Sequence, residues 1–198
     1  MKLEEILSTI KSTQGTNAKK ELLSTHSDNK LFLKALFYAL NPYKPFNLVK
    51  VPKTLTRNPL EDAWELFFNA ADSCSSRKVT GNAAVQTMML TFSHATAEQE
   101  KWMRKILKKH LAIGVSEKTV NSVIPGHVPT FDVALAQKYD FKRIKTNLIG
   151  VEPKLDGIRC FAIVEKGDVK LYARSGKVIS NFDTTIGPEL LKLGDGCY

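Results

Sequence analysis

The 198 residues are enough for one ordinary domain, or for one domain and part of a second. The hydrophobic fraction is 43% and the charged fraction 25%, values normal for a soluble globular protein that buries a sizeable core. The net charge of +9 is typical of proteins that meet polyanions, because each neutralised phosphate releases a counterion, although solubility alone accounts for it equally well.

The excess positive charge lies mostly in the first part of the chain. Residues 1–130 hold 18 Lys and Arg against 11 Asp and Glu, whereas residues 131–198 hold 11 against 9. We therefore expect residues 1–130 to bind a polyanion weakly, in a salt-dependent way and without sequence preference.

Cysteine usage and hydropathy indicate a soluble intracellular protein. Cys74, Cys160 and Cys197 are odd in number, far apart and without a C-x-x-C pair, which argues against a disulfide scaffold and against a zinc ribbon. The N-terminus lacks the apolar core of a signal peptide, and no stretch approaches the roughly 20 apolar residues of a membrane span.

The first elements in chain order are helices. Leu3, Ile6, Leu7 and Ile10 recur at helical spacing. Asp28 is predicted to cap a second helix that ends at Asn41-Pro42. Its predicted apolar face consists of Leu31, Phe32, Ala35, Leu36 and Ala39. Residues 43–58, with several Lys and Arg and two prolines, predict a basic loop.

An aromatic stripe marks the next helix. Pro59 suits its first turn, and the apolar positions follow at helical spacing. These positions are Leu60, Ala63, Trp64, Phe67, Phe68 and Ala71. Such a stripe is typical of a core rather than of a binding surface.

Three more helices are predicted from their caps, which are Thr80, Thr96 and Ser116. Their expected buried residues are Val85, Met88, Met89 and Phe92 in the first, and Trp102, Ile106 and Leu107 in the second. Lysines at 105, 108 and 109 indicate the end of the second helix. The third is short and ends at Pro125-Gly126.

After a junction at residues 128–130, the pattern changes from helix to strand. Two strands, residues 159–164 and 169–173, are joined by the turn at Lys166-Gly167-Asp168. Ser175-Gly176 turns again, residues 178–179 resume an extended run, and residues 184–193 form a short helix. So few strands are marginal alone, and we therefore expect this second domain to be cut off.

Lys154 is the candidate nucleophile. It ends one extended segment, and Gly157 opens a turn into the next. A free lysine, with a pKa of about 10.4, is protonated at neutral pH, so its amine attacks only when neighbouring cations or desolvation lower that pKa. Arg159 and a metal ion on a nucleotide would both help, and would hold the charge that develops on phosphorus.

The residues around Lys154 carry a family resemblance. Lys154-x-Asp156-Gly157-x-Arg159 resembles motif I of the covalent nucleotidyltransferases, which are DNA ligases, RNA ligases and mRNA capping enzymes. Arg174-Ser175-Gly176 follows a hairpin, where motif Ia of DNA ligases is placed. Two other stretches resemble the helical DNA-binding domain of ATP-dependent DNA ligases, in particular phage ones. They are residues 77–84, and residues 111–116 with Asn121 and Pro125-Gly126.

This resemblance covers most of residues 1–182 and implies an α+β fold. Residues 1–130 would form an all-helical DNA-binding domain, and residues 131–198 the first strands of a nucleotidyltransferase domain, the ligase adenylation domain. The implied activity is nick sealing in replication, repair and recombination of DNA, with ATP and magnesium. Motifs that the family carries further along do not occur before Tyr198, so we expect a truncated chain that does not complete ligation.

The resemblance also implies residue roles. Lys154 would attack the α-phosphate of ATP, carry AMP, and pass it to the 5′-phosphate of a nick. Asp156 and Gly157 would shape the loop around the lysine, and Arg159 would contact the nucleotide or the nick phosphate. Arg174 would recognise the nick, although an ordinary hairpin arginine stays an alternative. Glu152 occupies the position at which the backbone of the family's members contacts adenine.

The predicted DNA-binding residues are Arg77, Lys78, Gly81, Asn82, Gly114, Ser116 and Lys118. Glycines near helix starts let backbone N–H groups approach a phosphate, which the helix dipole favours. Such contacts bind the DNA backbone without reading sequence. From spacing alone, capping by Gly81 and a helix stop at Gly114 are the commoner roles, and the resemblance favours DNA contact.

Several alternatives remain open. Residues 152–157 also resemble NAD-dependent ligases, but Arg159 and the helical domain favour ATP. A non-catalytic DNA-binding fragment is the second hypothesis, and RNA joining or capping the third, against which residues 1–130 argue. The four histidines lack metal-ligand spacing, so no residue is assigned to a metal. We expect a monomer that binds nicked duplex DNA in the cytoplasm, of a host cell if viral, and no membrane.

Overall fold

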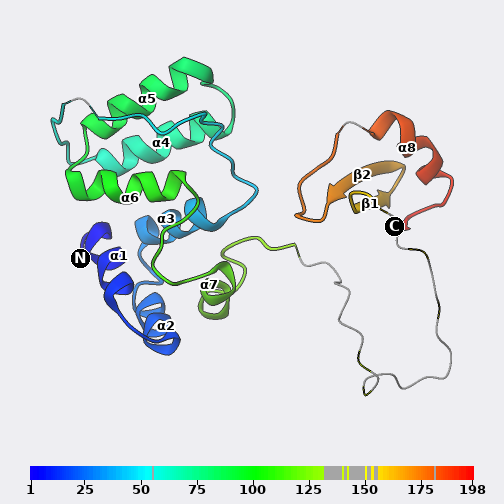
Figure 1. Cartoon of the computed structure of the whole chain (residues 1–198), viewed down its shortest axis with the longest axis horizontal. Coiled ribbons are helices and arrows are strands. Elements are labelled where there is room, and N and C mark those ends of the chain that lie inside the picture. The colour runs from blue at the N-terminus through cyan, green and yellow to red at the C-terminus, as the bar shows by residue number, and fades with distance from the viewer. Residues whose placement is uncertain are drawn as a thin grey trace. The chain divides into compact units, whose positions relative to one another are not determined.

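The computed structural model describes residues 1–54, 56–131, 140, 142, 150, 153, 156–180 and 182–198. The chain divides into two compact units, unit 1 (Met1–Pro129) and unit 2 (Thr130–Tyr198). The described part of unit 1 is helical and that of unit 2 holds a small antiparallel sheet, so the predicted α+β class is confirmed (Figure 1).

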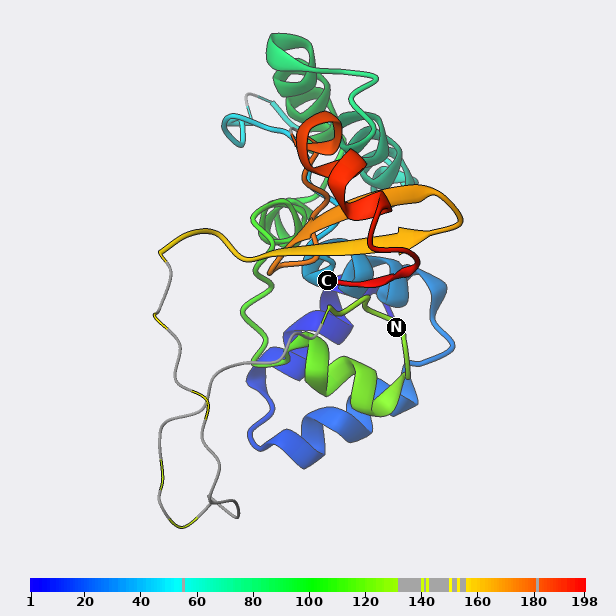
Figure 2. The ribbon, with the colours of Figure 1, turned by 90° about the vertical axis from the view of Figure 1, so that its right-hand side faces the viewer.

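In its described part, unit 1 forms seven helices (Figures 1 and 2). They are α1 (Leu3–Ser12), α2 (Thr16–Thr25), α3 (Lys30–Leu40), α4 (Ala63–Ser75), α5 (Gly81–Ser93), α6 (Ala97–Leu107) and α7 (Glu117–Val123). Helix α4 lies against α5 and α6, and α6 also contacts α1 and α3, while α7 contacts α2. Helix α6 therefore lies at the centre of the contacts within this unit.

The core of unit 1 is built from the predicted apolar faces. All four apolar positions of α1 are buried, and α4 buries Trp64, Phe67 and Phe68, so the aromatic stripe is core, as expected. Trp102 of α6 is fully buried. In α5, Met88 and Phe92 are buried, but the expected Val85 and Met89 are only partly covered.

Two helix starts differ from the prediction, and helix α2 was not predicted. Asn29, and not Asp28, caps α3, since its side chain accepts a hydrogen bond from the backbone N–H of Phe32 (3.0 Å). Pro59 does not begin a helix, because α4 begins at Ala63.

The physical reason for the later start of α4 is a competing partner for the backbone. The N–H groups of Asn58 and Leu60 donate to the carbonyls of Ser93 and His94 at the end of α5 (2.7 and 2.9 Å). These bonds tie the chain on both sides of Pro59 to α5, and Leu60 stays 41% exposed.

The caps of α6 and α7 are confirmed. The Thr96 hydroxyl accepts from the N–H of Gln99 (3.2 Å), and the Gln99 side chain accepts from the N–H of Thr96 (2.9 Å), which is a capping box. Ser116 accepts from the N–H of Thr119 (3.3 Å). Thr80 is the N-cap residue of α5 but makes no side-chain cap bond.

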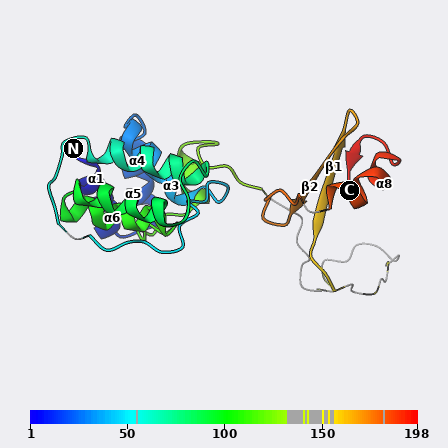
Figure 3. The same ribbon diagram turned by 90° about the horizontal axis from the view of Figure 1, so that it is seen from above.

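Unit 2 contains a three-stranded antiparallel sheet in its described part (Figure 3). The strands are β1 (Cys160–Glu165), β2 (Asp168–Ala173) and β3 (Gly196–Cys197), in the order β2-β1-β3. Lys166 and Gly167 form a two-residue turn with φ values of 53° and 80°. Positive φ at both turn residues matches the twist of the flanking strands, so the predicted hairpin is confirmed.

Helix α8 (Asp183–Leu191) packs on β1 and β2, close to the predicted 184–193. Ala162, Val164 and Leu171 are buried on one face of the hairpin. Phe161 and Tyr172 pair across the strands on the other face. Alternation along each strand explains this division, since successive side chains point to opposite faces.

Candidate nucleotide and nucleic-acid site

The residues predicted to bind DNA lie at two turns of unit 1, and all of them are exposed. The turn between α4 and α5 holds Arg77 and Lys78, and Gly81 and Asn82 begin α5. Gly114 and Ser116 precede α7, and Lys118 lies in its first turn. Each turn therefore gathers its own group of predicted residues at the surface.

The first turn depends on left-handed backbone. Arg77 and Gly81 have φ values of 59° and 57°. Gly81 adopts this conformation at little cost, and no heavy atom lies within 4 Å of the position that a Cβ atom would take. The glycine is therefore required by backbone conformation and leaves open space at the start of α5.

In the second turn the predicted residues have structural partners. The Lys19 ammonium of α2 donates to the carbonyl of Ile113 (2.5 Å), and a Cβ atom at Gly114 would collide with that ammonium. Gly114 also has a φ of 69°, and Ser116 is the N-cap of α7. Close packing and capping therefore account for both residues without a ligand.

A hollow of about 320 Å³ adjoins the first turn. It is lined by Lys44, Asp72, Ser73, Ser75, Ser76 and Lys78. Lys44 pairs with Asp72 (Nζ to Oδ1, 2.6 Å) and lies 4.5 Å from the centre of the Tyr38 ring. The sequence placed Lys44 only in a basic loop, and nothing in the local pattern indicates that it reaches α4.

The carboxylate in this hollow is stabilised in its charged form. Burial alone raises the pKa of Asp72, but hydrogen bonds from Lys44 and Tyr38 and the charges of Lys44 and Lys34 outweigh it, so the pKa lies below its ordinary value. Burial, with the Asp72 contact as a smaller cause, raises the pKa of the Tyr38 phenol. Asp72 therefore offsets part of the positive charge that Lys44 brings.

Lys109 lies between the group formed by Lys44, Asp72 and Tyr38 and the second turn. Its ammonium donates to the carbonyls of Tyr38 and Asn41 at the end of α3 (2.6 and 3.0 Å). Burial, and to a smaller extent the charge of Lys44, lowers its pKa to about 8. Lys109 also lines a second hollow, of about 460 Å³, together with Gly114 and Ser116. Lys109 therefore lies close enough to Lys44 to feel its charge and borders the hollow at the second turn.

In unit 2, the two predicted arginines lie at the same end of the hairpin. Cys160 pairs with Ala173, so Arg159 precedes β1 where Arg174 follows β2. Both are exposed. The Arg159 guanidinium lies 6.0 Å from the centre of the Phe161 ring. Two guanidinium groups at one end of a hairpin fit a phosphate-bearing ligand.

Aromatic rings pack against one another at the end of the hairpin that carries the two arginines. Phe131 contacts Phe161 edge-on (5.9 Å between ring centres) and stacks on Tyr172 (6.0 Å). Asp156 and Gly157 are exposed just before Arg159. Lys154 and Glu152, the predicted nucleophile and adenine-proximal residue, lie outside the described residues.

Among the described residues, no group of three or more His, Cys, Asp or Glu could hold a metal ion, and we assign no ligand to magnesium. Within the same residues, no helix has the length and apolar character needed to cross a membrane.

Comparison with known proteins yields one class. No family model matches the chain. The chain is similar to DNA ligases, namely those of Enterobacteria phages T4 and T6, each 28% identical over 204 residues that cover 96% of this chain and 40% of the relative. It therefore resembles the T-even bacteriophage DNA ligase along nearly its whole length, as its motifs predicted.

Two solved structures agree with this likeness. The one named Pmar-Lig_PreS3 has a TM-score of 0.81 and 29% identity, and covers 98% of this chain and 47% of that chain. The one named Pmar-Lig_Pre. has a TM-score of 0.79 and 29% identity, and covers 99% of this chain and 48% of that chain. The chain thus spans less than half the length of each of these relatives.

Proposed function

We propose that the chain carries the DNA-binding and nucleotide-attaching parts of an ATP-dependent DNA ligase that seals nicks through AMP on Lys154. The observation that carries this proposal is the likeness to phage DNA ligases over 96% of the chain. Motif residues that a nucleotidyltransferase needs, Lys154, Asp156 and Arg159, occur within that stretch. The chain spans 40% of the length of those relatives.

The two proposed domains correspond to the two structural units. Residues 1–130 form the helical DNA-binding domain, and residues 131–198 belong to the adenylation domain. Support comes from the boundary at Pro129 and Thr130, and from the change there from helices to a hairpin sheet.

Covalent chemistry is assigned to Lys154. Its neutral Nζ forms a bond to the α-phosphorus of ATP while the bond to pyrophosphate breaks, which leaves AMP on the lysine. AMP passes to the 5′-phosphate at a nick, and the 3′-hydroxyl then displaces AMP and joins the strand. Magnesium, when bound, would neutralise phosphate charge during these steps.

Nearby residues position the reacting groups. Asp156 and Gly157 shape the approach to Lys154, and Glu152 lies beside the adenine. Arg159 and Arg174 hold phosphate oxygens, which the shared hairpin end supports.

Duplex binding is assigned to the two turns of unit 1. Arg77, Lys78 and Lys118 contact backbone phosphates, Gly81 leaves the start of α5 open to them, and the exposed Asn82 lies beside it. Gly114 and Ser116 contribute by holding the second turn in shape. We further propose that the protein acts as a monomer in the cytoplasm, that of the host cell if it is viral.

The test is covalent labelling of the gene product that contains this chain. With ATP labelled on the α-phosphate and magnesium, the unaltered protein is expected to acquire label, and Lys154→Ala to acquire none. Lys170→Ala, which removes an exposed lysine of β2, serves as the matched control and should label normally. Label that survives Lys154→Ala would place the nucleophile elsewhere and overturn the proposal.

A further inference from the structure

The solvent-facing side of α6 carries a second group of cations, separate from the two turns. A hollow of about 380 Å³ is lined there by Arg57, Glu100, Lys101, Arg104, Lys105 and Lys108, together with one alanine. We call the five cations of this group the α6 cationic surface. Lys101, Lys105 and Lys108 recur at helical spacing, so their stems leave the same side of α6.

Two of these cations are held by a buried carboxylate. The Glu100 side chain is 6% exposed and pairs with both Arg57 and Arg104, the latter at 2.6 Å. Thr54 also donates to Glu100 (2.6 Å). The Arg104 guanidinium lies 4.5 Å from the centre of the Phe92 ring. These arginines are therefore ordered before any ligand arrives, which lowers the entropy lost on binding.

The lysines of the surface carry charge that nearby carboxylates do not balance. Glu98 pairs with Lys101 (3.1 Å), but Glu100 is already shared by the arginines. Burial, and then the charges of Lys11 and Lys101, lower the pKa of Lys105. An anion over this surface would relieve that repulsion.

The spacing favours a regular polyanion. Lys101 and Lys108 are separated by about 10 Å along the helix axis, at a rise of about 1.5 Å per residue. That distance matches about three phosphate-to-phosphate steps of one DNA strand along the duplex axis, at about 3.4 Å each. The aromatic rings of Phe92 and Trp102 are buried beneath the cations, so the surface lacks the apolar anchor of a protein interface.

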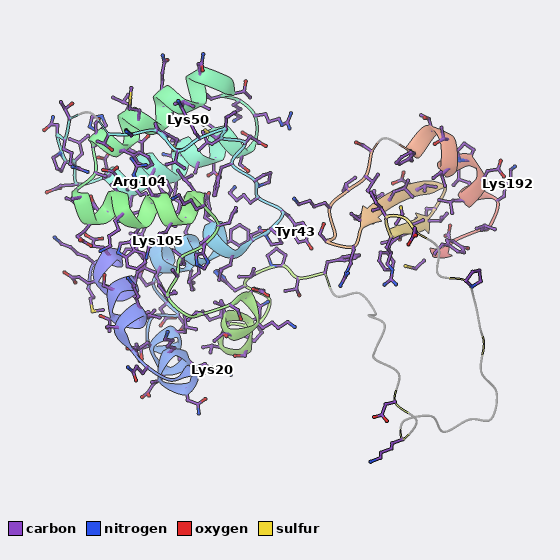
Figure 4. The ribbon with its side chains drawn as sticks, viewed as in Figure 1. Lys20, Tyr43, Lys50, Arg104, Lys105 and Lys192 are labelled. Carbon is purple, nitrogen blue, oxygen red and sulfur yellow. The ribbon has the colours of Figure 1, made fainter. Side chains whose placement is uncertain are left out.

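We propose that the α6 cationic surface is a second contact for the phosphate backbone of duplex DNA, outside the two turns already assigned. The proposal rests on the ligase function and extends the duplex footprint to α6 and the loop before α4. Figure 4 shows Arg104 and Lys105 along α6, apart from Lys20 on α2.

The experiment compares duplex affinity of three charge variants of the full chain. Lys101→Gln/Lys105→Gln/Lys108→Gln removes the lysines and leaves Arg57 and Arg104 to satisfy Glu100. Glutamine preserves helix propensity, and equal melting temperatures would confirm an intact fold. We expect about tenfold weaker binding and a loss of about 2 to 3 from the slope of log affinity against log salt. The triple Lys→Arg variant at the same positions should bind normally.

The matched control removes the same charge elsewhere. Lys20→Gln/Lys30→Gln/Lys192→Gln should change the affinity by less than about twofold. Equal losses in the control and the α6 variant, or no loss in either, would overturn the proposal, as would an unaltered chain that does not bind duplex DNA. A negative result in this affinity experiment does not change the expected labelling of Lys154, so the two proposals are tested independently.

Discussion

Glu100 illustrates how one buried residue organises a charged surface. Burial alone raises the pKa of its carboxyl, but hydrogen bonds from Thr54, Arg57 and Arg104 outweigh it and hold the pKa below its ordinary value. The sequence predicted Thr96 as the cap of this helix, and Glu100 lies in the first turn of α6. What the sequence did not predict is that Arg57, far away in the chain, reaches the same carboxylate.

Glu100→Gln is expected to destabilise unit 1 by about 1 to 3 kcal/mol at neutral pH, because charge-assisted hydrogen bonds are replaced by weaker ones. A carboxyl with a lowered folded pKa contributes stability above its unfolded pKa of about 4.3 and loses it as the pH falls through the folded pKa. The free energy of unfolding, measured with urea at a series of pH values, should therefore decrease less below about pH 4.3 in the variant than in the unaltered protein. An equal decrease in the two proteins would contradict this account.

At the scale of elements, the β1–β2 hairpin was the most predictable part of unit 2. The two β-rich runs joined by the turn at Lys166-Gly167-Asp168 predicted the hairpin. In the structure the turn is one residue shorter, because Asp168 pairs with Glu165 and begins β2. Helix ends were less predictable. The prediction at Pro59 was wrong because backbone bonds to the end of α5 compete with the helix, and those bonds join segments far apart in the chain.

The turn makes a testable prediction. Gly167→Ala should destabilise the hairpin by about 1 to 2 kcal/mol, since alanine at a φ of 80° is strained although no atom lies within 4 Å of its Cβ. Lys166→Asn should be neutral or stabilising, because asparagine tolerates a positive φ better than lysine. Amide exchange of β1 and β2 in the full chain measures both effects. Slower exchange in Gly167→Ala than in the unaltered chain would refute the argument.

At the scale of the whole molecule, charge is distributed by unit. The excess of Lys and Arg falls in residues 1–130, and the structure gathers part of it into the Lys44 and Lys109 cluster and the α6 cationic surface. The candidate DNA-binding residues were predicted from motifs. Lys105 and Lys108 were interpreted only as signals of a helix end, and Lys101 was not interpreted, so the stripe that these three lysines form on α6 was not predicted.

Binding of the full chain to duplex DNA should therefore be electrostatic and independent of sequence. Affinity is expected to fall steeply as salt rises, and two duplexes of unrelated sequence should bind within about threefold of each other. Fluorescence anisotropy across a salt series measures both. Equal affinity at low and high salt would show that phosphate contacts do not dominate.

The sequence by itself determined the apolar faces of most helices of unit 1, but not helix α2, which it did not predict. It also determined the hairpin of unit 2 and the motif around Lys154, because these features depend on periodicity and short spacing within one segment. Only the tertiary structure decided which cations act together. Arg57 meets Glu100, Lys44 meets Asp72 and Lys109 meets the end of α3 through contacts between distant parts of the chain. Such contacts arise when buried polar groups find partners as the core closes, and no local pattern records them.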